Sequence, residues 1–253
     1  MKVIMIKILI ILIFLLIFPI RSFSIDFKGY DINKLNELLK ECTDGNLNIQ
    51  YNRLTNTIRF IETDFGKPLI SKKIYSYNEK INDISYEDVS RYFIDSYKKL
   101  FGLLDVEKEL KIKKITLNEN QDRFIRYQQL FNYVPVFLGE AIIQLNKEKD
   151  IISVTSKLIP NIDISTLPFI SPAYAKEIAL NAVAKWHNIS PEKLIAEEPT
   201  LWIYNPIVFN ILNNKNYLVW KTEISSIDIK PIQHTVLIDG IDGKIRLHFN
   251  TVK

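Results

Sequence analysis

Cysteine, glycine and histidine are scarce in this sequence. Its 253 residues include one Cys, 7 Gly and 3 His. A single thiol, Cys42, cannot form an internal disulfide, so the fold does not depend on a disulfide framework. We expect Cys42 to be a small, partly buried side chain, because its neighbours Glu41 and Asp44 disfavour a reactive thiolate. The low glycine content excludes collagen-like repeats, and no period typical of solenoid repeats is present.

The short motifs of common enzyme classes are also missing. A zinc peptidase of the thermolysin type needs His-Glu-x-x-His on a helix, so that two imidazoles one turn apart bind the metal. None of His187, His234 and His248 is followed by Glu, and no two are four residues apart. His234 and His248 fall on neighbouring predicted strands, but two histidines without an evident carboxylate partner make a poor zinc site. We predict that the protein is not an enzyme and has no catalytic, cofactor-binding or metal-binding residue.

The charge balance argues against nucleic acid as a partner. The formal net charge is +4. Lys2, Lys7 and Arg21 account for most of it, because the first 24 residues contain no acid. In the rest of the chain basic and acidic side chains nearly cancel and are interspersed, which is typical of a solvated surface.

The N-terminus has the pattern of a secretory signal peptide over residues 1–24. An apolar run from Ile8 to Phe18 is broken by Pro19, and small residues lead up to a cleavage position after Ser24. The run is too short to span a bilayer comfortably, although an uncleaved membrane anchor is the alternative, since Arg21 lies on the unexpected side. We expect a secreted or cell-envelope protein, extracellular or periplasmic, with no stable membrane insertion after cleavage.

Hydrophobic periodicity predicts an α+β fold of two small domains, each a helix packed on an antiparallel sheet. Ser85 and Asp88 form a capping box for a helix whose apolar stripe is expected in the core. That stripe comprises Val89, Phe93, Tyr97, Leu100 and Phe101. The other elements predicted before residue 159 are a helix at 31–40, a hairpin at 47–60, and strands at 111–118, 123–131, 134–138, 141–146 and 151–158.

The second half begins with a proline-containing linker at 159–170. Ser171 and Pro172 then act as cap and first-turn proline of a helix. Its predicted buried face comprises Ala175, Ile178, Ala179, Ala182, Val183 and Trp186. A short helical turn opens at Ser190, and strands follow at 200–204, 217–225 and 234–250, the last folded back at Gly240 to Gly243.

Two strands carry a recognisable motif. The segment Arg126-Tyr127-Gln128-Gln129 followed by Val134-Pro135-Val136-Phe137 resembles the fungalysin/thermolysin propeptide (FTP) domain. In that family a basic-aromatic-Gln-Gln strand is followed by a turn and Val-Pro-Val-Phe. The helix before it and the strands after it also match. The family usually has Gly where this chain has Tyr133, Leu138 and Asp150.

The second half resembles a PepSY domain, the usual next module of thermolysin-like pro-regions. The resemblance rests on Ile170 to Ala173, Pro199 to Tyr204, Tyr217 to Lys221 and Val236 to Ile245. The resulting domain prediction is a signal peptide at 1–24, an N-terminal helix and hairpin segment at 25–84, an FTP-like domain at 85–158, a linker at 159–170 and a PepSY-like domain at 171–253.

The resemblance implies a secreted metallopeptidase pro-region without its catalytic domain. Such pro-regions assist the folding of the peptidase that follows and occupy its cleft until they are cleaved. We therefore expect an inhibitor or chaperone of a thermolysin-like metallopeptidase. A truncated or split remnant of such a precursor, and an envelope-side binding module without a peptidase partner, are the alternatives. The predicted peptidase-facing tail is Phe249, Asn250, Thr251, Val252 and Lys253, by position alone.

Overall fold

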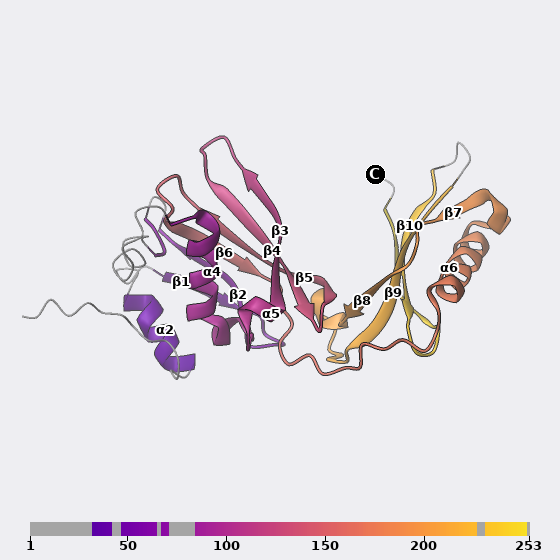
Figure 1. The fold of residues 1–253 in the computed structure, drawn as a ribbon, viewed down its shortest axis with the longest axis horizontal. Coiled ribbons are helices and arrows are strands. Elements are labelled where there is room, and N and C mark those ends of the chain that lie inside the picture. Colours follow the sequence, from indigo (N-terminus) through magenta and orange to yellow (C-terminus); the bar gives the residue numbers. More distant parts are fainter. Residues whose placement is uncertain (1–31, 42–46, 65–66, 71–83, 227–230, 252–253) are drawn as a thin grey trace, which may run out of the picture.

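The computed structural model describes residues 32–41, 47–64, 67–70, 84–226 and 231–251 (Figure 1). The predicted signal peptide and Cys42 lie outside these residues. The first group of elements, which we name the N-terminal lobe, consists of α2 (Ile32–Glu41), β1 (Leu47–Tyr51), β2 (Ile58–Thr63), α4 (Tyr86–Ser96), η1 (Lys98–Phe101), α5 (Val106–Glu109), β3 (Leu110–Leu117), β4 (Arg123–Phe131), β5 (Val134–Leu145) and β6 (Ile151–Ser156).

The remaining elements form the C-terminal lobe. They are α6 (Pro172–His187), η2 (Pro191–Lys193), β7 (Leu194–Ala196), β8 (Thr200–Tyr204), η3 (Pro206–Phe209), β9 (Tyr217–Ser226), β10 (Gln233–Asp239) and β11 (Ile245–Asn250). The predicted α+β class is confirmed. The domain boundaries stay a prediction.

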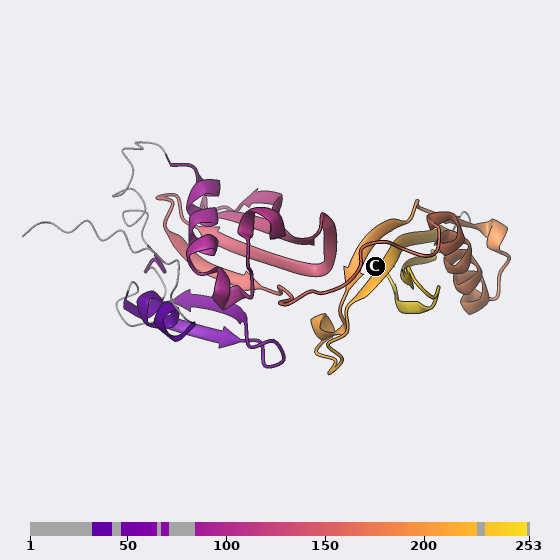
Figure 2. The same cartoon turned by 60° about the horizontal axis from the view of Figure 1, so that its bottom comes forward.

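The two lobes share one hydrogen-bonded sheet. The main path runs β1-β2-β6-β5-β8-β9-β10-β11, with β4 and β3 following β5 on a branch and β7 pairing with β9. Among the described strands, all pairs are antiparallel except β5 with β8, which meet in parallel at Val136 and Ile203. One narrow contact between strands therefore connects two otherwise separate antiparallel sheets (Figures 1 and 2).

The helix α4 forms the centre of the N-terminal core. Ser85 and Asp88 make the predicted capping box. The predicted stripe is fully buried, and it packs against residues of β4, β5 and β6. The α-helix itself ends at Ser96, and the last stripe residues belong to η1, which Gly102 terminates with a φ of 73°. A left-handed residue at a helix end satisfies the last carbonyl groups.

The prediction of two separate strands in the region of β5 was wrong. The sequence predicted two strands at 134–138 and 141–146, whereas the structure has a single strand through Leu145. Leu138 has a φ of 58°, and the register with β4 shifts between Gln128 and Leu130. The extra residues bulge out of the ladder without ending it, because a bulge re-aims a strand while pairing resumes beyond it.

In the C-terminal lobe α6 covers one face of the sheet, against β9 and β10 (Figure 1). Ser171 caps the helix and Pro172 occupies its first turn, as predicted. Ala175, Ala179 and Val183 are buried, but Trp186 is 40% exposed, so its assignment to the core was wrong. The ring of Trp186 lies against a histidine of β11 instead. The three-residue strand β7 was not predicted, because it is too short to show a period.

The segment between β6 and α6, which contains the predicted linker, has no helix or strand. It is nevertheless fixed at both ends. Ile159 is buried, and its backbone N–H and C=O bond to the side chain of Gln129. The backbone N–H groups of Phe169 and Ile170 donate to the carbonyl of Gly240. The segment thus runs along the molecule as a strap anchored to each lobe (Figure 2).

Candidate functional site

The family-motif strands lie at the junction between the lobes. β4 carries Arg126 to Gln129, and β5 carries Val134 to Phe137 on the neighbouring strand. Val136 is buried at the one parallel pairing with β8. The sequence predicted the motif but not this position, because the contact partner Ile203 is 67 residues further along the chain.

The two motif glutamines satisfy backbone groups that the bulge and the strap leave unpaired. Gln128 Nε2 donates to the carbonyls of Val136 at 2.7 Å and Gly139 at 3.1 Å. Gln129 Nε2 donates to the carbonyl of Ile159 at 2.8 Å, and its Oε1 accepts the Ile159 N–H at 2.9 Å. A primary amide has both a donor and an acceptor, so glutamine suits these positions. Both side chains are buried; Gln128 bonds to the bulged part of β5 and Gln129 to the start of the strap.

Arg126 forms an ion pair whose acid the sequence did not identify. Its Nη1 lies 2.5 Å from Oε2 of Glu140 on β5, and Lys113 Nζ lies 2.7 Å from the other carboxylate oxygen. Burial opposes ionisation of Glu140, but hydrogen bonds from Lys113 and Arg126 outweigh it, so the pKa of Glu140 lies below its ordinary value. Tyr127, the next motif residue, faces the opposite side and its hydroxyl contacts Ser90 Oγ at 2.5 Å in the core.

Phe137 brings the motif together with the predicted tail. Its ring is the centre of an aromatic cluster with Trp202 and Tyr204 of β8, each at 6.3 Å between centroids, and with Phe249 of β11 at 6.5 Å. The sequence predicted Phe137 and Phe249 as unrelated site residues. The structure places them in contact across the lobe junction.

The predicted tail continues the edge strand of the sheet. β11 pairs only with β10 among the described strands, with Asn250 opposite His234. The Thr251 N–H donates to the carbonyl of Gln233 at 2.8 Å, so pairing extends just beyond the strand. Val252 and Lys253 lie outside the described residues. An edge strand offers backbone groups to which a partner strand can add.

All three histidines converge beside Trp186. His187 Nε2, at the end of α6, lies 2.9 Å from His234 Nε2 on β10. The ring of His248 stacks on Trp186 at 4.0 Å between centroids and lies 6.3 Å from the ring of His234. The sequence predicted the approach of the two strand histidines, but not the contribution of the helix.

His234 is the buried member of this cluster. It is 7% exposed, and its Nδ1 has no hydrogen-bond partner. Burial lowers the pKa of His234, and the neighbouring His187 and His248 lower it further. Among the described residues no group of three or more His, Cys, Asp or Glu side chains is arranged to hold a metal ion. The cluster joins the end of α6 to the sheet through the contact between His187 and His234.

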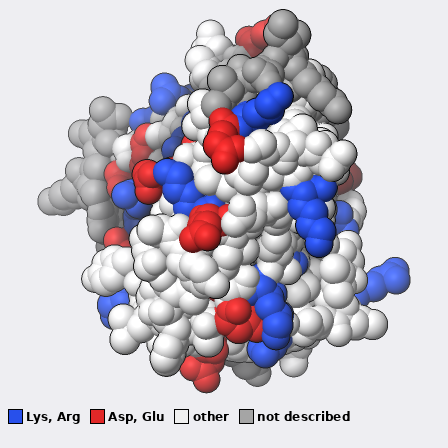
Figure 3. All heavy atoms as spheres, turned by 90° about the vertical axis from the view of Figure 1, so that its right-hand side faces the viewer, with Lys and Arg blue, Asp and Glu red and all other residues white. Residues whose placement is uncertain are grey.

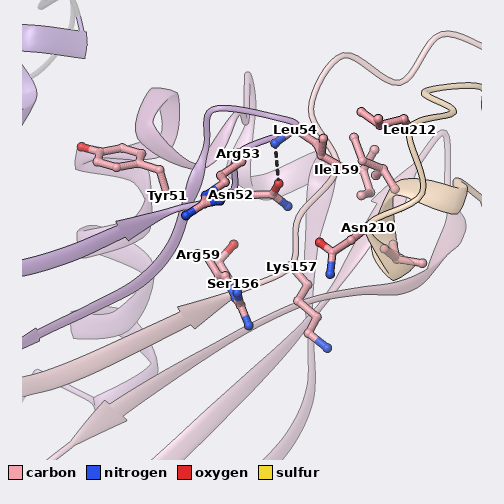
Figure 4. A pocket seen from close by; sticks show the side chains of 12 residues that line it. Tyr51, Asn52, Arg53, Leu54, Arg59, Ser156, Lys157, Ile159, Asn210 and Leu212 are labelled. Atoms are coloured by element: carbon pink, nitrogen blue, oxygen red, sulfur yellow. Dashed lines mark hydrogen bonds between the residues drawn. The ribbon is translucent and has the colours of Figure 1, made fainter.

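A groove of about 550 Å³ lies beside the lobe junction (Figure 4). Three stretches that are distant in sequence form it: the β1–β2 hairpin, the end of β6 with the start of the strap, and η3 with the loop after it. We name it the junction groove. Its lining residues are Tyr51, Asn52, Arg53, Leu54, Arg59, Ser156, Lys157, Ile159, Ile207, Val208, Asn210 and Leu212.

The junction groove carries charge of one sign. Arg53, Arg59 and Lys157 line it, and no Asp or Glu does. All three cations are exposed, and none forms an ion pair in the described part of the chain. Sequence analysis missed this feature, because the cations are spaced irregularly and only tertiary structure brings them together.

One other face of the molecule carries mixed charges. The end of the molecule formed by the C-terminal lobe shows Lys and Arg side chains interspersed with Asp and Glu (Figure 3). This face offers no extended basic patch of the kind that binds nucleic acid. Within the residues that the structure describes, no helix combines the length and the apolar character needed to cross a bilayer.

Comparison with known proteins identifies a partial relative. Bacillolysin of Brevibacillus brevis, a thermolysin-like peptidase, is 21% identical over 170 residues, which are 65% of this chain and 31% of the bacillolysin chain. This chain thus spans about a third of the length of that relative. The C-terminal domain of Bacillus megaterium YpeB is 12% identical and covers 88% of this chain and 99% of its own, with a TM-score of 0.39. No family model matches.

Proposed function

We propose that this protein is an exported, non-catalytic pro-region-like protein that inhibits a thermolysin-like zinc metallopeptidase, assists its folding, or does both. The observation that carries the proposal is the similarity to bacillolysin over 170 residues. The resemblance of the motif strands to pro-region modules supports it. The lack of a His-Glu-x-x-His motif in the sequence supports a role without peptidase chemistry of its own.

The geometry supplies a physical route to inhibition. β11 is a sheet edge that ends beside Phe249, and Phe249 is anchored on Phe137 at the lobe junction. A peptide that enters a protease cleft in extended form can pair its backbone with the enzyme, as strand addition does elsewhere. The end of β11 and the residues after it are the candidates for this contact.

The test is inhibition of a purified thermolysin-like peptidase by the chain from Ile25 to Lys253, which contains every described residue. We expect saturable inhibition that persists after preincubation while the inhibitor remains intact on a gel. Intact, folded protein that neither binds nor inhibits the peptidase contradicts the proposal. It would favour a remnant of a peptidase precursor, or an envelope-side binding module.

A truncation after Asn250 locates the inhibitory contact. It removes Thr251 to Lys253 and keeps β11 within its observed bounds. We expect weaker inhibition with unchanged circular dichroism, because the sheet retains every residue of β11 and only the three residues after it are removed. A matched control changes Thr251 alone to Ala, which separates the loss of one hydroxyl hydrogen bond from the loss of the tail. Full inhibition by the truncated chain would exclude the tail from the contact.

A further inference from the structure

We propose that the junction groove binds an acidic polypeptide segment, in which two or more carboxylates flank an apolar side chain. The proposal starts from charge. Arg53, Arg59 and Lys157 line one groove of about 550 Å³ without an acid among the lining residues. Like charges gathered at one site repel each other, and a bound anion relieves that repulsion.

The polar groups of the groove act mainly as donors. Asn52 Oδ1 accepts the N–H of Leu54 at 2.9 Å, which leaves the Asn52 amide N–H₂ to donate outward. The Asn210 side chain also faces the groove (Figure 4). Guanidinium, ammonium and amide donors together match carboxylate oxygens and peptide carbonyls. A cationic ligand has no acidic side chain to bind in this lining.

The apolar part of the lining distinguishes a polypeptide from a small anion. Leu54, Ile159 and Ile207 belong to one apolar cluster that forms the inner side of the groove. Leu212 also lines the groove and is 88% exposed. Exposed apolar residues beside a polar site are typical of protein contacts, and an inorganic ion would leave them in water. An acidic segment that contains an apolar residue would contact both the cations and the apolar side chains of the groove.

The groove is built on fixed parts of the fold. Ile159 is held by the Gln129 amide, and the loop after η3 is held by Asn205, whose buried side chain bonds to Asn214 and Asn216. Pockets at the contact between two structural units are common ligand sites. The site also does not involve β11, so it is independent of the inhibitory contact proposed above.

Fluorescence anisotropy with a synthetic peptide tests the proposal. The probe is fluorescein-labelled acetyl-Glu-Glu-Leu-Glu-Glu-amide, and the protein is the chain from Ile25 to Lys253. We expect saturable binding that weakens as NaCl rises, because exposed ion pairs are screened. The protein should bind the Gln-Gln-Leu-Gln-Gln peptide about tenfold more weakly than the Glu peptide. The affinity for the Glu peptide should also fall by about tenfold in the triple variant Arg53→Gln/Arg59→Gln/Lys157→Gln.

A matched control removes the same number of charges elsewhere. Lys111→Gln, Lys114→Gln and Lys185→Gln lie on β3 and α6, outside the groove lining, and should keep the affinity within about twofold. The single variant Leu212→Asn tests the apolar contact separately and should also weaken binding. Because Leu212 and the three groove cations are exposed, circular dichroism should show folded variants.

Several results would overturn the proposal. Absence of binding by the wild-type chain would do so, as would equal affinity for the Gln peptide or an unchanged affinity of the triple variant. Displacement of the probe by pyrophosphate at equal concentration would identify a small-anion site instead. Binding only to vesicles with anionic lipid would identify a membrane surface. Since no peptidase is present in this assay, its outcome is independent of the inhibition test.

Discussion

At the scale of single residues, the hairpin turn between β4 and β5 contains a residue type that is unfavourable for its backbone conformation. Asn132 and Tyr133 have φ values of 48° and 66°, so both turn residues are left-handed. Asn tolerates this region, but Tyr carries a Cβ that crowds the following carbonyl. Tyr133 is 92% exposed, so its ring provides little packing in return.

Tyr133→Gly should therefore stabilise the protein relative to Tyr133→Ala. Both variants lose the ring, but only Gly removes the Cβ that is strained at a positive φ. We expect a difference of about 1 kcal/mol in the free energy of unfolding, measured by urea denaturation. A Gly variant less stable than the Ala variant would mean that this turn is not strained.

Gln129→Ala tests the link between the motif and the strap. Gln129 is 1% exposed and satisfies both backbone groups of Ile159. Its loss leaves a buried donor and a buried acceptor unpaired, which should cost about 2 kcal/mol of stability. The exposed Gln50→Ala on β1 is the control and should change stability by less than about 0.5 kcal/mol. Similar urea midpoints for the two variants would contradict a bridging role.

At the scale of elements, the contact between α6 and the sheet depends on which histidines are protonated. His187 and His234 share a hydrogen bond between their Nε2 atoms, and one of these atoms must be unprotonated to accept it. The titratable groups that act on His234 are His187 of α6 and His248 of β11. These groups include no carboxylate, so nothing among them would offset the repulsion between two protonated histidines.

Stability should accordingly fall as the solution becomes mildly acidic. The pKa of His234 is lowered in the folded state by burial, then by His187 and His248. The unfolded chain therefore takes up a proton first, near the ordinary pKa of 6.5. The contribution of neutral His234 is fully present above that pH and is lost as the pH drops toward the lower folded-state pKa.

Urea midpoints measured between pH 8 and pH 5.5 check this expectation, since most carboxylates titrate below that range. Wild type should lose stability more steeply with falling pH than His234→Gln. Parallel profiles for the two proteins would show that the histidine cluster does not control the response.

At the scale of the whole molecule, the two lobes are joined by a narrow contact. The sheet continues through one parallel pairing, Val136 with Ile203, and the aromatic cluster around Phe137 lies beside it. The strap is anchored to both lobes. Apolar residues of both lobes also pack together beside this pairing. We therefore expect the packing of the junction to determine whether the lobes unfold together.

Phe137→Ala should loosen the junction. Phe137 is buried against Trp202, Tyr204 and Phe249, and removing its ring should cost about 3 kcal/mol. We also expect faster limited proteolysis within residues 160–170, because the strap spans the contact that is weakened. The control Phe209→Ala removes an exposed ring on η3 and should leave both measurements nearly unchanged. A strap as resistant as in wild type would show that the lobes are held by other contacts.

Local patterns in the sequence determined most elements of the fold. The capping box at Ser85, the proline-initiated helix α6 and the strands β4 and β8 follow from signals within a few residues, which short-range backbone chemistry controls. The continuity of β5 did not follow, because a bulge leaves the alternation interrupted while the ladder persists. β7 was too short to show a period, and η3 was not predicted.

Some features of the candidate sites also followed from the sequence, and others depended on the tertiary structure. The sequence by itself determined the motif positions on β4 and β5 and the mixed charge of the chain, because both are properties of short segments or of composition. Only the tertiary structure decided that Phe137 meets Phe249, that Glu140 pairs with Arg126, and that three cations share one groove. These contacts join segments far apart in the chain, and their partners are set by sheet register and lobe packing, which no local pattern encodes.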